Sequence, residues 1–289
     1  MKTTTIYIIL NTIGYLFMII TNAIPNIVKL NGNTVSSVSD DSPTRITPSG
    51  FTFSIWGVIY TFLGLWVVTQ VVSLFAFKKQ IQDQISKRVD SIGVVFFISC
   101  LANGTWIFVW GYGHLVASFF VILVILASLV FIYVKIQIQF NKRKNAEYSE
   151  VLTEMPYEET SESRWVLFIY DHTSFSLYLA WINVATIINL TIALQIWGLD
   201  SLYTKNAWAI VIFILLTIIG LILLVINSDY AYNLVFIWAL IGIVSKQGKD
   251  KTLKVIGLTC IGLLSLFILI SIVFKIKKKV KKKDLTTNL

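Results

Sequence analysis

The chain has 289 residues, of which 56% are apolar and only 13% are charged. A soluble domain carries about 25% charged residues, so this composition excludes an ordinary soluble enzyme, a disordered tail and a nucleic-acid-binding domain. The net charge of +9 does not indicate nucleic acid, because the lysines and arginines lie in short groups between long apolar runs, as they do beside membrane-spanning helices. We therefore expect a polytopic membrane protein, with the lipid bilayer as its surroundings and no nucleic-acid partner.

Eight stretches are long and apolar enough to cross a hydrocarbon core of about 30 Å. In chain order they cover residues 6–27, 51–77, 91–110, 115–136, 175–197, 208–226, 230–245 and 255–274. Each run is continuously apolar rather than alternating, which excludes a β-barrel and predicts an all-α membrane helix bundle. The first stretch is long and contains Asn11 and Asn22, which favours a retained helix over a cleaved signal peptide. The seventh stretch is the shortest and gives the weakest signal.

Residues 29–49, 78–90 and 140–164 are polar and are expected to form extramembrane loops. The last of these starts basic and turns acidic, which indicates a solvated loop rather than a cation site, because carboxylates scattered on a flexible loop do not preorganise a metal. With eight spans, one face receives both termini, residues 78–90 and the basic tail at 276–289, and it holds most of the lysines and arginines. The positive-inside bias therefore predicts that both termini are cytoplasmic.

The sequence carries no standard catalytic or metal-ligand motif, such as His-Glu-x-x-His, Gly-x-Ser-x-Gly, a phosphate-binding glycine loop or Cys-x-x-Cys. Cys100 and Cys260 lie inside apolar runs, His114 lies in a predicted turn, and His172 lies near a predicted membrane interface. We expect no metal and no cofactor, and an enzyme is disfavoured. The predicted spans have no Asp, Glu, Lys, Arg or His at their centres, which argues against an ion-coupled transporter.

Tryptophan and asparagine are unusually frequent within the predicted helices. Asparagine in lipid costs free energy unless it faces another helix or a cavity, and this applies to Asn11, Asn103, Asn183, Asn189 and Asn233. Tryptophan is most often an anchor at the membrane interface, which accounts for Trp66, Trp110, Trp165, Trp197 and Trp208 near predicted span ends. Trp56, Trp106 and Trp181 lie instead within helical motifs flanked by polar residues, and these motifs indicate a function.

Three such motifs resemble the tryptophan-rich sensory protein family, which includes the translocator protein. Residues 47–60 read Thr-Pro-Ser-Gly-Phe-Thr-Phe-Ser-Ile-Trp-Gly-Val-Ile-Tyr and are followed by Leu63-Gly64, like the first loop and second helix of that family. Residues 101–108, Leu-Ala-Asn-Gly-Thr-Trp-Ile-Phe, resemble its third helix. Residues 178–189, Tyr-Leu-Ala-Trp-Ile-Asn-Val-Ala-Thr-Ile-Ile-Asn, resemble its fifth helix. The motifs occur in the family's order, on the second, third and fifth predicted spans.

The resemblance covers the first five spans and departs from the family at three points. Ser174 stands where the family has a proline before the tyrosine of the fifth helix, segment 140–164 is longer, and three further spans follow the fifth. The resemblance therefore implies a five-helix membrane domain at 1–197, three additional transmembrane helices at 198–275 and a basic tail at 276–289.

The resemblance also implies a function. Family members are five-helix bundles with a pocket that opens toward the first loop and binds porphyrins and, in animals, cholesterol and synthetic ligands. This chain is therefore expected to be a membrane-embedded sensor or carrier for a hydrophobic small molecule, such as a porphyrin or another tetrapyrrole, or a sterol-like lipophile. The alternatives are a secondary transporter of a small lipophilic or zwitterionic solute, and a structural bundle whose tryptophans and asparagines only hold helices together. A homodimer is left open.

Helical spacing predicts which residues face this pocket. Side chains three or four positions apart share a helix face, which groups Trp56 with Tyr60, Asn103 with Trp106, Tyr178 with Trp181, and Ala185 with Asn189. We expect the three faces to converge beneath the loop that contains Pro48. Flat ligands stack on aromatic rings and are oriented by a few polar groups. We therefore expect Trp56 and Trp181 to stack on the ligand, Asn103 to give a hydrogen bond and Ala185 to leave room.

Overall fold

The computed structural model describes residues 2–151, 161–199 and 205–287. Apart from one isolated bridge between Leu30 and Asn33, the regular structure of these residues is helical. The elements are α1 (Lys2–Ile27), α2 (Val35–Asp41), the short 3-10 helix η1 (Gly50–Ser54), α3 (Ile55–Ser73), α4 (Lys79–Ile92), α5 (Val95–Gly111), α6 (Leu115–Val151), α7 (Ser161–Ile196), α9 (Asn206–Asn227), α10 (Tyr230–Gln247) and α11 (Lys251–Thr287). The predicted all-α fold is confirmed.

Each of the eight predicted spans contains a helix, and six of these helices are long and apolar enough to cross a membrane. The six are α1, α3 together with η1, α6, α7, α9 and α11. Helix α5 reaches the required length only together with α4, from which it is bent by 58°. Helix α10 has 18 residues, and Asn233, Lys246 and Gln247 lower its hydropathy. The chain is an integral membrane protein with several spans.

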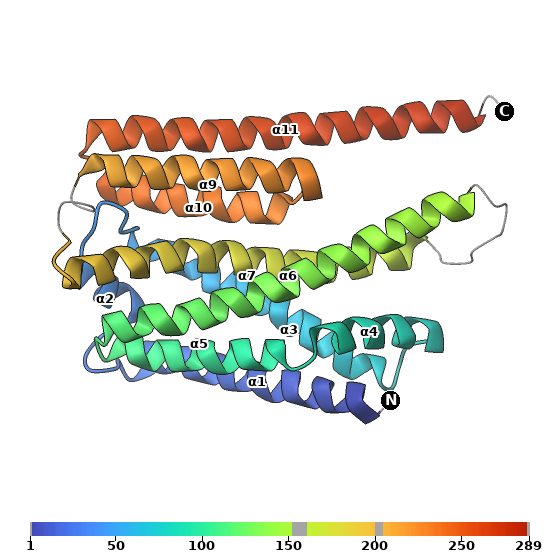
Figure 1. Cartoon of the computed structure of the whole chain (residues 1–289), viewed down its shortest axis with the longest axis horizontal. Coiled ribbons are helices and arrows are strands. Elements are labelled where there is room, and N and C mark those ends of the chain that lie inside the picture. Colours follow the sequence, from blue (N-terminus) through green and yellow to red (C-terminus); the bar gives the residue numbers. More distant parts are fainter. Residues whose placement is uncertain (1, 152–160, 200–204, 288–289) are drawn as a thin grey trace.

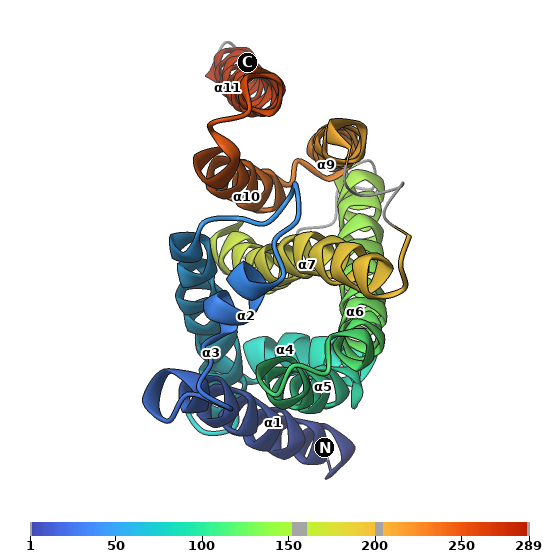
Figure 2. The ribbon, with the colours of Figure 1, turned by 90° about the vertical axis from the view of Figure 1, so that its left-hand side faces the viewer.

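The long helices run side by side along the molecule, and the N- and C-termini lie at the same end (Figure 1). Seen from the opposite end, α1, α3, α5, α6 and α7 form one group with α2 in front of α3 and α7, while α9, α10 and α11 lie outside α7 (Figure 2). Helix α7 packs against α3 and α6 within the first group and against α10 of the second. The three C-terminal helices are thus added to the outer side of α7.

The expectation of a loop at residues 78–90 is wrong, because this segment forms most of α4. Ile85 and Val89 on its apolar face pack against Ile8 of α1, which gives an amphipathic helix a buried side. Gly93 follows with a φ of 59°, a conformation that glycine adopts without steric cost. This residue allows the sharp bend between α4 and α5.

The other two polar segments are also more helical than expected. Residues 29–49 contain α2, which begins after the N-cap Thr34, whose side chain accepts a hydrogen bond from the amide of Ser37 (3.2 Å). The ends of α6 and α7 take up most of residues 140–164. Residues 152–160 of this segment lie outside the part of the chain that the structure describes.

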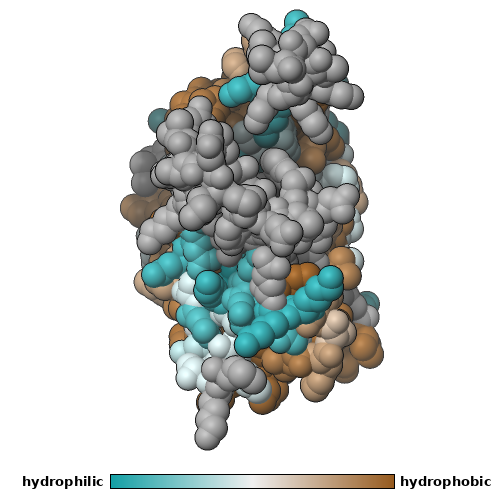
Figure 3. Space-filling view, turned by 90° about the vertical axis from the view of Figure 1, so that its right-hand side faces the viewer, coloured by the Kyte–Doolittle hydropathy of each residue, from teal (hydrophilic) through white to brown (hydrophobic). Residues whose placement is uncertain are grey.

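Apolar side chains cover the flanks of the bundle. Large hydrophobic residues such as Ile9, Val211 and Leu269 are exposed, as expected of side chains that face lipid. The end that carries the termini shows hydrophilic side chains next to these flanks (Figure 3), and the exposed Lys79 and Lys87 of α4 belong to it. Both termini therefore lie on one hydrophilic face, while the side of the membrane that this face occupies stays a prediction.

Candidate ligand-binding site

Helices α3 and α7 bring aromatic side chains of two sequence motifs into contact. Trp56 stacks on Tyr60, with ring centroids 5.2 Å apart and planes inclined by 18°. Trp56 also makes edge-to-face contacts with Tyr178 (5.9 Å) and Trp181 (6.2 Å) of α7. Phe53 of η1 makes a third edge-to-face contact, with Trp181 (6.0 Å). Aromatic pairs favour these geometries over face-to-face sandwiches, so the contacts hold the rings in defined orientations.

A series of hydrogen bonds beside these rings links α1, α3, α5 and α7. The hydroxyl of Tyr60 donates to Asn22 Oδ1 (2.6 Å), and Asn22 Nδ2 donates to Asn103 Oδ1 (2.7 Å). Asn103 Nδ2 in turn donates to the hydroxyl of Tyr178 (2.8 Å). Interhelical bonds of this kind satisfy polar side chains inside a membrane bundle. Since the oxygen and the nitrogen of the Asn103 amide are both bonded within the protein, this residue positions Asn22 and Tyr178.

A second set of hydrogen bonds holds the motifs of α5 and α7 together. Trp106 Nε1 donates to Asn189 Oδ1 (3.3 Å), which also accepts from the hydroxyl of Ser118 on α6 (2.9 Å). Asn189 Nδ2 donates to the carbonyl of Ala185 one turn earlier (2.9 Å). The Trp106 ring stacks on Trp110, with centroids 5.2 Å apart and planes inclined by 20°. This wall is therefore rigid and mostly aromatic.

The two walls enclose a small inner cavity. Its lining residues are Ser39, Phe53, Trp56, Trp106, Trp110, Trp181, Ala185, Ile188 and Asn189. The free volume of about 10 Å³ is enough for about one water molecule. Two buried polar atoms of the lining residues, Ser39 Oγ and Trp181 Nε1, have no hydrogen-bond partner among the described residues. Buried polar groups are almost always bonded, so these two atoms mark a place for a water or for a polar atom of a ligand.

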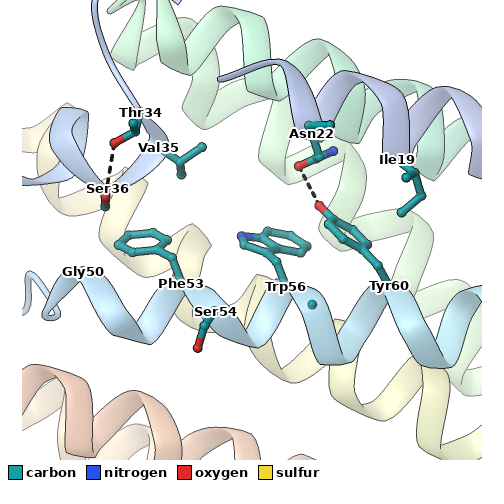
Figure 4. A pocket seen from close by; sticks show the side chains of 12 residues that line it. Ile19, Asn22, Thr34, Val35, Ser36, Gly50, Phe53, Ser54, Trp56 and Tyr60 are labelled. Carbon is teal, nitrogen blue, oxygen red and sulfur yellow. Dashed lines mark hydrogen bonds between the residues drawn. The ribbon is translucent and has the colours of Figure 1, made fainter. Parts of the chain in front are cut away.

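An open groove of about 500 Å³ adjoins the inner cavity. Its lining residues are Ile19, Asn22 and Ala23 of α1, Thr34, Val35 and Ser36 at α2, and Gly50, Phe53, Ser54, Trp56, Gly57 and Tyr60 of η1 and α3. Figure 4 shows Phe53, Trp56 and Tyr60 projecting from one wall toward Asn22 and Ile19 on the other. Phe53 and Trp56 line both spaces, so their rings form the partition between them. Small-molecule pockets measure about 300–1,000 Å³, a size that the groove has and the inner cavity lacks.

The predicted pocket residues divide into two groups. Trp56, Trp106, Trp181, Ala185 and Asn189 line the inner cavity, while Tyr60 joins Trp56 in the groove. Asn103 and Tyr178 line neither space and supply hydrogen bonds behind the rings. The structure thus joins all eight residues through shared ring contacts, hydrogen bonds and the two spaces, whereas ligand binding by them stays a prediction.

Several residues that line the site were not predicted from the sequence, among them Asn22, Phe53 and Ser39. Asn22 was recognisable by the same criterion as Asn103, because it is an asparagine inside a span. Phe53 lies within the first quoted motif, but it belongs to η1, before α3 begins at Ile55. The helical spacing that groups Trp56 with Tyr60 was therefore not extended to it. Ser39 has no signal in the sequence, because it belongs to a polar segment that was expected to be a loop.

Two buried contacts between ionisable side chains near the other end of α7 were also missed. Asp171 accepts a hydrogen bond from Trp66 Nε1 (2.9 Å) and forms an ion pair with Arg88 of α4. His172 lies 3.5 Å from the carboxylate of Asp229, which is completely buried. Trp66 and His172, which were expected near a membrane interface, are both buried within the bundle. Among the described residues, no group of three His, Cys, Asp or Glu side chains could hold a metal ion.

The family of the chain follows from a comparison of its sequence with known proteins and family models. No curated protein and no solved structure matches the chain. A family model described as TSPO-like protein matches residues 8–273. This match extends beyond the first five spans, to which the quoted motifs are confined, and includes α9, α10 and most of α11. Because the match covers most of the chain, the protein belongs to the family of TSPO-like proteins.

Proposed function

We propose that the protein binds flat hydrophobic molecules within the bilayer, such as porphyrins and other tetrapyrroles or sterol-like lipophiles, and acts as their sensor or carrier. The observation that carries this proposal is the pair of unbonded buried atoms, Trp181 Nε1 and Ser39 Oγ, among lining residues that are mostly aromatic. An apolar slot with a few convergent polar groups is the usual form of a small-molecule site.

The groove supplies the volume that the inner cavity lacks. A flat ring system in the groove can stack on Phe53, Trp56 and Tyr60, which line it side by side. A shift of the Trp56 ring joins the two spaces, so that a carbonyl or carboxylate oxygen of the ligand can accept the free N–H of Trp181. Ala23 and Gly57 of the groove are exposed on the apolar flank. This exposure favours entry of the ligand from lipid.

Fluorescence titration of the purified protein in nanodiscs with protoporphyrin IX and cholesterol tests the proposal. Binding should quench or shift tryptophan emission, and a flat response to both probes would remove the proposal. Trp56→Ala removes a stacking ring and should weaken binding by about 1–3 kcal/mol, or roughly 5- to 150-fold. Trp181→Phe keeps a ring but removes the N–H, and it should weaken binding about 2- to 13-fold.

Trp208→Phe is the matched control for these variants. Trp208 donates to Thr191 (3.1 Å) and lines neither the groove nor the inner cavity, so its replacement should leave affinity unchanged. If Trp56→Ala and Trp181→Ala fold and bind protoporphyrin IX like the parent, the assignment of the pocket is wrong. The tryptophans would then serve only to hold helices together.

A proton-coupled carrier is a second candidate, and the burial of His172 and Asp229 favours it. Ionisable side chains inside membrane bundles often belong to ion pathways. Uptake of a lipophilic solute into proteoliposomes under a pH gradient tests this candidate. Uptake that depends on the gradient and is lost in Asp229→Asn would favour the carrier, whereas gradient-independent binding alone would favour the sensor.

A further inference from the structure

The first loop closes one side of the inner cavity. Ser39 at the end of α2 and Phe53 in η1 both line that cavity, and residues 40–52 are the chain that joins them. The beginning of α2 is tied to the bundle, because Trp110 Nε1 donates to the carbonyl of Val35 (3.0 Å). Because residues 40–52 join two lining residues of the inner cavity, a movement of this segment would displace Ser39 or Phe53.

One face of α10 lies against this segment. Trp238, Gly242 and Lys246 are spaced four positions apart, so they share a helix face. Trp238 Nε1 donates to the carbonyl of Thr52 (2.9 Å), and the amide of Ser49 donates to the carbonyl of Gly242 (3.0 Å). These two bonds join residues of the chain that are almost 200 positions apart.

The packing at Gly242 is close. A methyl group at this position would collide with the side chain of Thr52, which is itself completely buried. Beside it, the rings of Phe51 and Trp238 make an edge-to-face contact with centroids 5.5 Å apart. Glycine is needed here so that the helix backbone can reach the loop.

Polar contacts continue along the end of α10 and into the turn before α11. Lys246 pairs with Asp40 (2.7 Å), Gln247 Nε2 donates to the carbonyl of Thr44 (3.0 Å), and Asp250 lies 3.7 Å from Arg45. Exposed ion pairs contribute little one by one. Together with the buried contacts of Gly242 and Trp238, however, they attach the whole segment to a single helix.

We propose that α10 clamps residues 40–52 and thereby controls the opening of the inner cavity. This inference rests on the proposed function for the identity of the ligand, but the clamp itself has a readout that needs no ligand. It gives the three C-terminal helices a regulatory role toward the site. Release of the clamp opens the cavity on the loop side, in addition to the groove between α1 and α3.

Thiol labelling at position 39 tests the clamp directly. The probe is Ser39→Cys in a background with Cys100→Ala and Cys260→Ala, and Ser39 suits it because its hydroxyl has no partner to lose among the described residues. Trp238→Phe combined with Lys246→Glu removes one hydrogen bond and reverses one ion pair while keeping an aromatic ring beside Phe51. In nanodiscs without ligand, a small methanethiosulfonate reagent should label this variant about tenfold faster than the parent probe.

Two further variants make the result specific. Lys249→Glu changes charge in the same turn, at an exposed residue without a hydrogen bond or ion pair among the described residues, and it should leave labelling slow. Adding Asp40→Lys to the variant with Lys246→Glu restores the ion pair and should slow labelling again. If the double variant does not fold, Gly242→Ala replaces it, because the added methyl group pushes Thr52 away from α10.

Unchanged labelling in the clamp variant would overturn the proposal, and so would equal acceleration in Lys249→Glu. Faster labelling together with faster dissociation of protoporphyrin IX supports it. Faster labelling with unchanged dissociation shows that the clamp does not control access and also overturns it. If the parent binds no protoporphyrin IX at all, the proposed function fails, while the labelling rates still decide the clamp.

Discussion

Asp229 is the residue whose replacement should most clearly loosen the three C-terminal helices. Its carboxylate accepts hydrogen bonds from the hydroxyls of Tyr133 on α6 (2.8 Å) and Ser176 on α7 (2.7 Å). It also caps α10, because the amide of Tyr232 donates to it (3.0 Å). The side chain is completely buried. One carboxylate thus joins α6 and α7 to the start of α10.

Asp229→Ala removes all three of these hydrogen bonds. Interhelical hydrogen bonds in membrane bundles are worth about 0.6 kcal/mol on average and about 1.7 kcal/mol at most. Two of the lost bonds are interhelical, and the third is the N-cap bond of α10, which is worth about 0.5–2 kcal/mol. Together they give an expected loss of about 2–5 kcal/mol in the free energy of unfolding. Asp229→Asn keeps the shape and one acceptor oxygen, so its loss should be roughly half as large.

Unfolding by sodium dodecyl sulfate in mixed micelles, followed by circular dichroism, measures this free energy. Asp83→Ala is the control, because it removes an exposed carboxylate on α4 and should change stability by less than about 0.5 kcal/mol. A loss below about 0.6 kcal/mol for Asp229→Ala, the average for a single bond, would refute the reasoning. The same conclusion would follow if Asp229→Asn were as destabilising as Asp229→Ala.

Three other predictions concern acid stability, topology and autonomy. The pKa of Asp250 lies below its usual value because the amide of Leu253 and the side chain of Asn206 donate to its carboxylate. The contribution of this carboxylate to the stability of the folded protein is therefore complete above the usual pKa. It is lost as the pH falls through the lowered pKa. Below about pH 4 hydrogen exchange at the start of α11 should accelerate, and Asp250→Asn should abolish this pH dependence. Cysteines introduced at Lys78 and Lys249 should be labelled from opposite sides of the membrane, the first only from the cytoplasm; labelling of both from one side would contradict the eight passes. A chain cut after Trp197 should yield little folded protein, because α7 loses its partners on α10; a stable, porphyrin-binding fragment would show that five helices suffice.

The helices could be predicted well from the sequence because the membrane imposes a simple rule. A span must be long, apolar and helical, so the eight apolar runs were recognisable. Spacing of three and four residues also grouped the aromatic and amide side chains of α3, α5 and α7 by helix face. These grouped residues contact one another in the structure through Trp56 and Asn103.

What the sequence did not predict depends on contacts between distant parts of the chain. Helix α4 was missed because it is amphipathic, and its apolar face becomes evident only against Ile8 of α1. The burial of Asp171 and His172 was missed because hydropathy places both near the end of a span, while their partners come from other helices. The clamp on the first loop could not be predicted for the same reason, because its partners lie almost 200 positions away in the chain. Only the spacing of Trp238, Gly242 and Lys246 on one helix face can be seen in the sequence.

The outer face of α7 explains why this chain has more than five helices. About 78% of its apolar stretch is buried inside the structure, far more than in any other candidate span. One face carries Trp181 toward the site, and the other carries Asn183, whose Nδ2 donates to the hydroxyl of Tyr232 on α10 (2.7 Å). In a five-helix bundle, Asn183 and Ser176 would face lipid, where polar groups without partners cost free energy. The polar residues on this face therefore require the added helices, and the same packing brings α10 against the loop that covers the site.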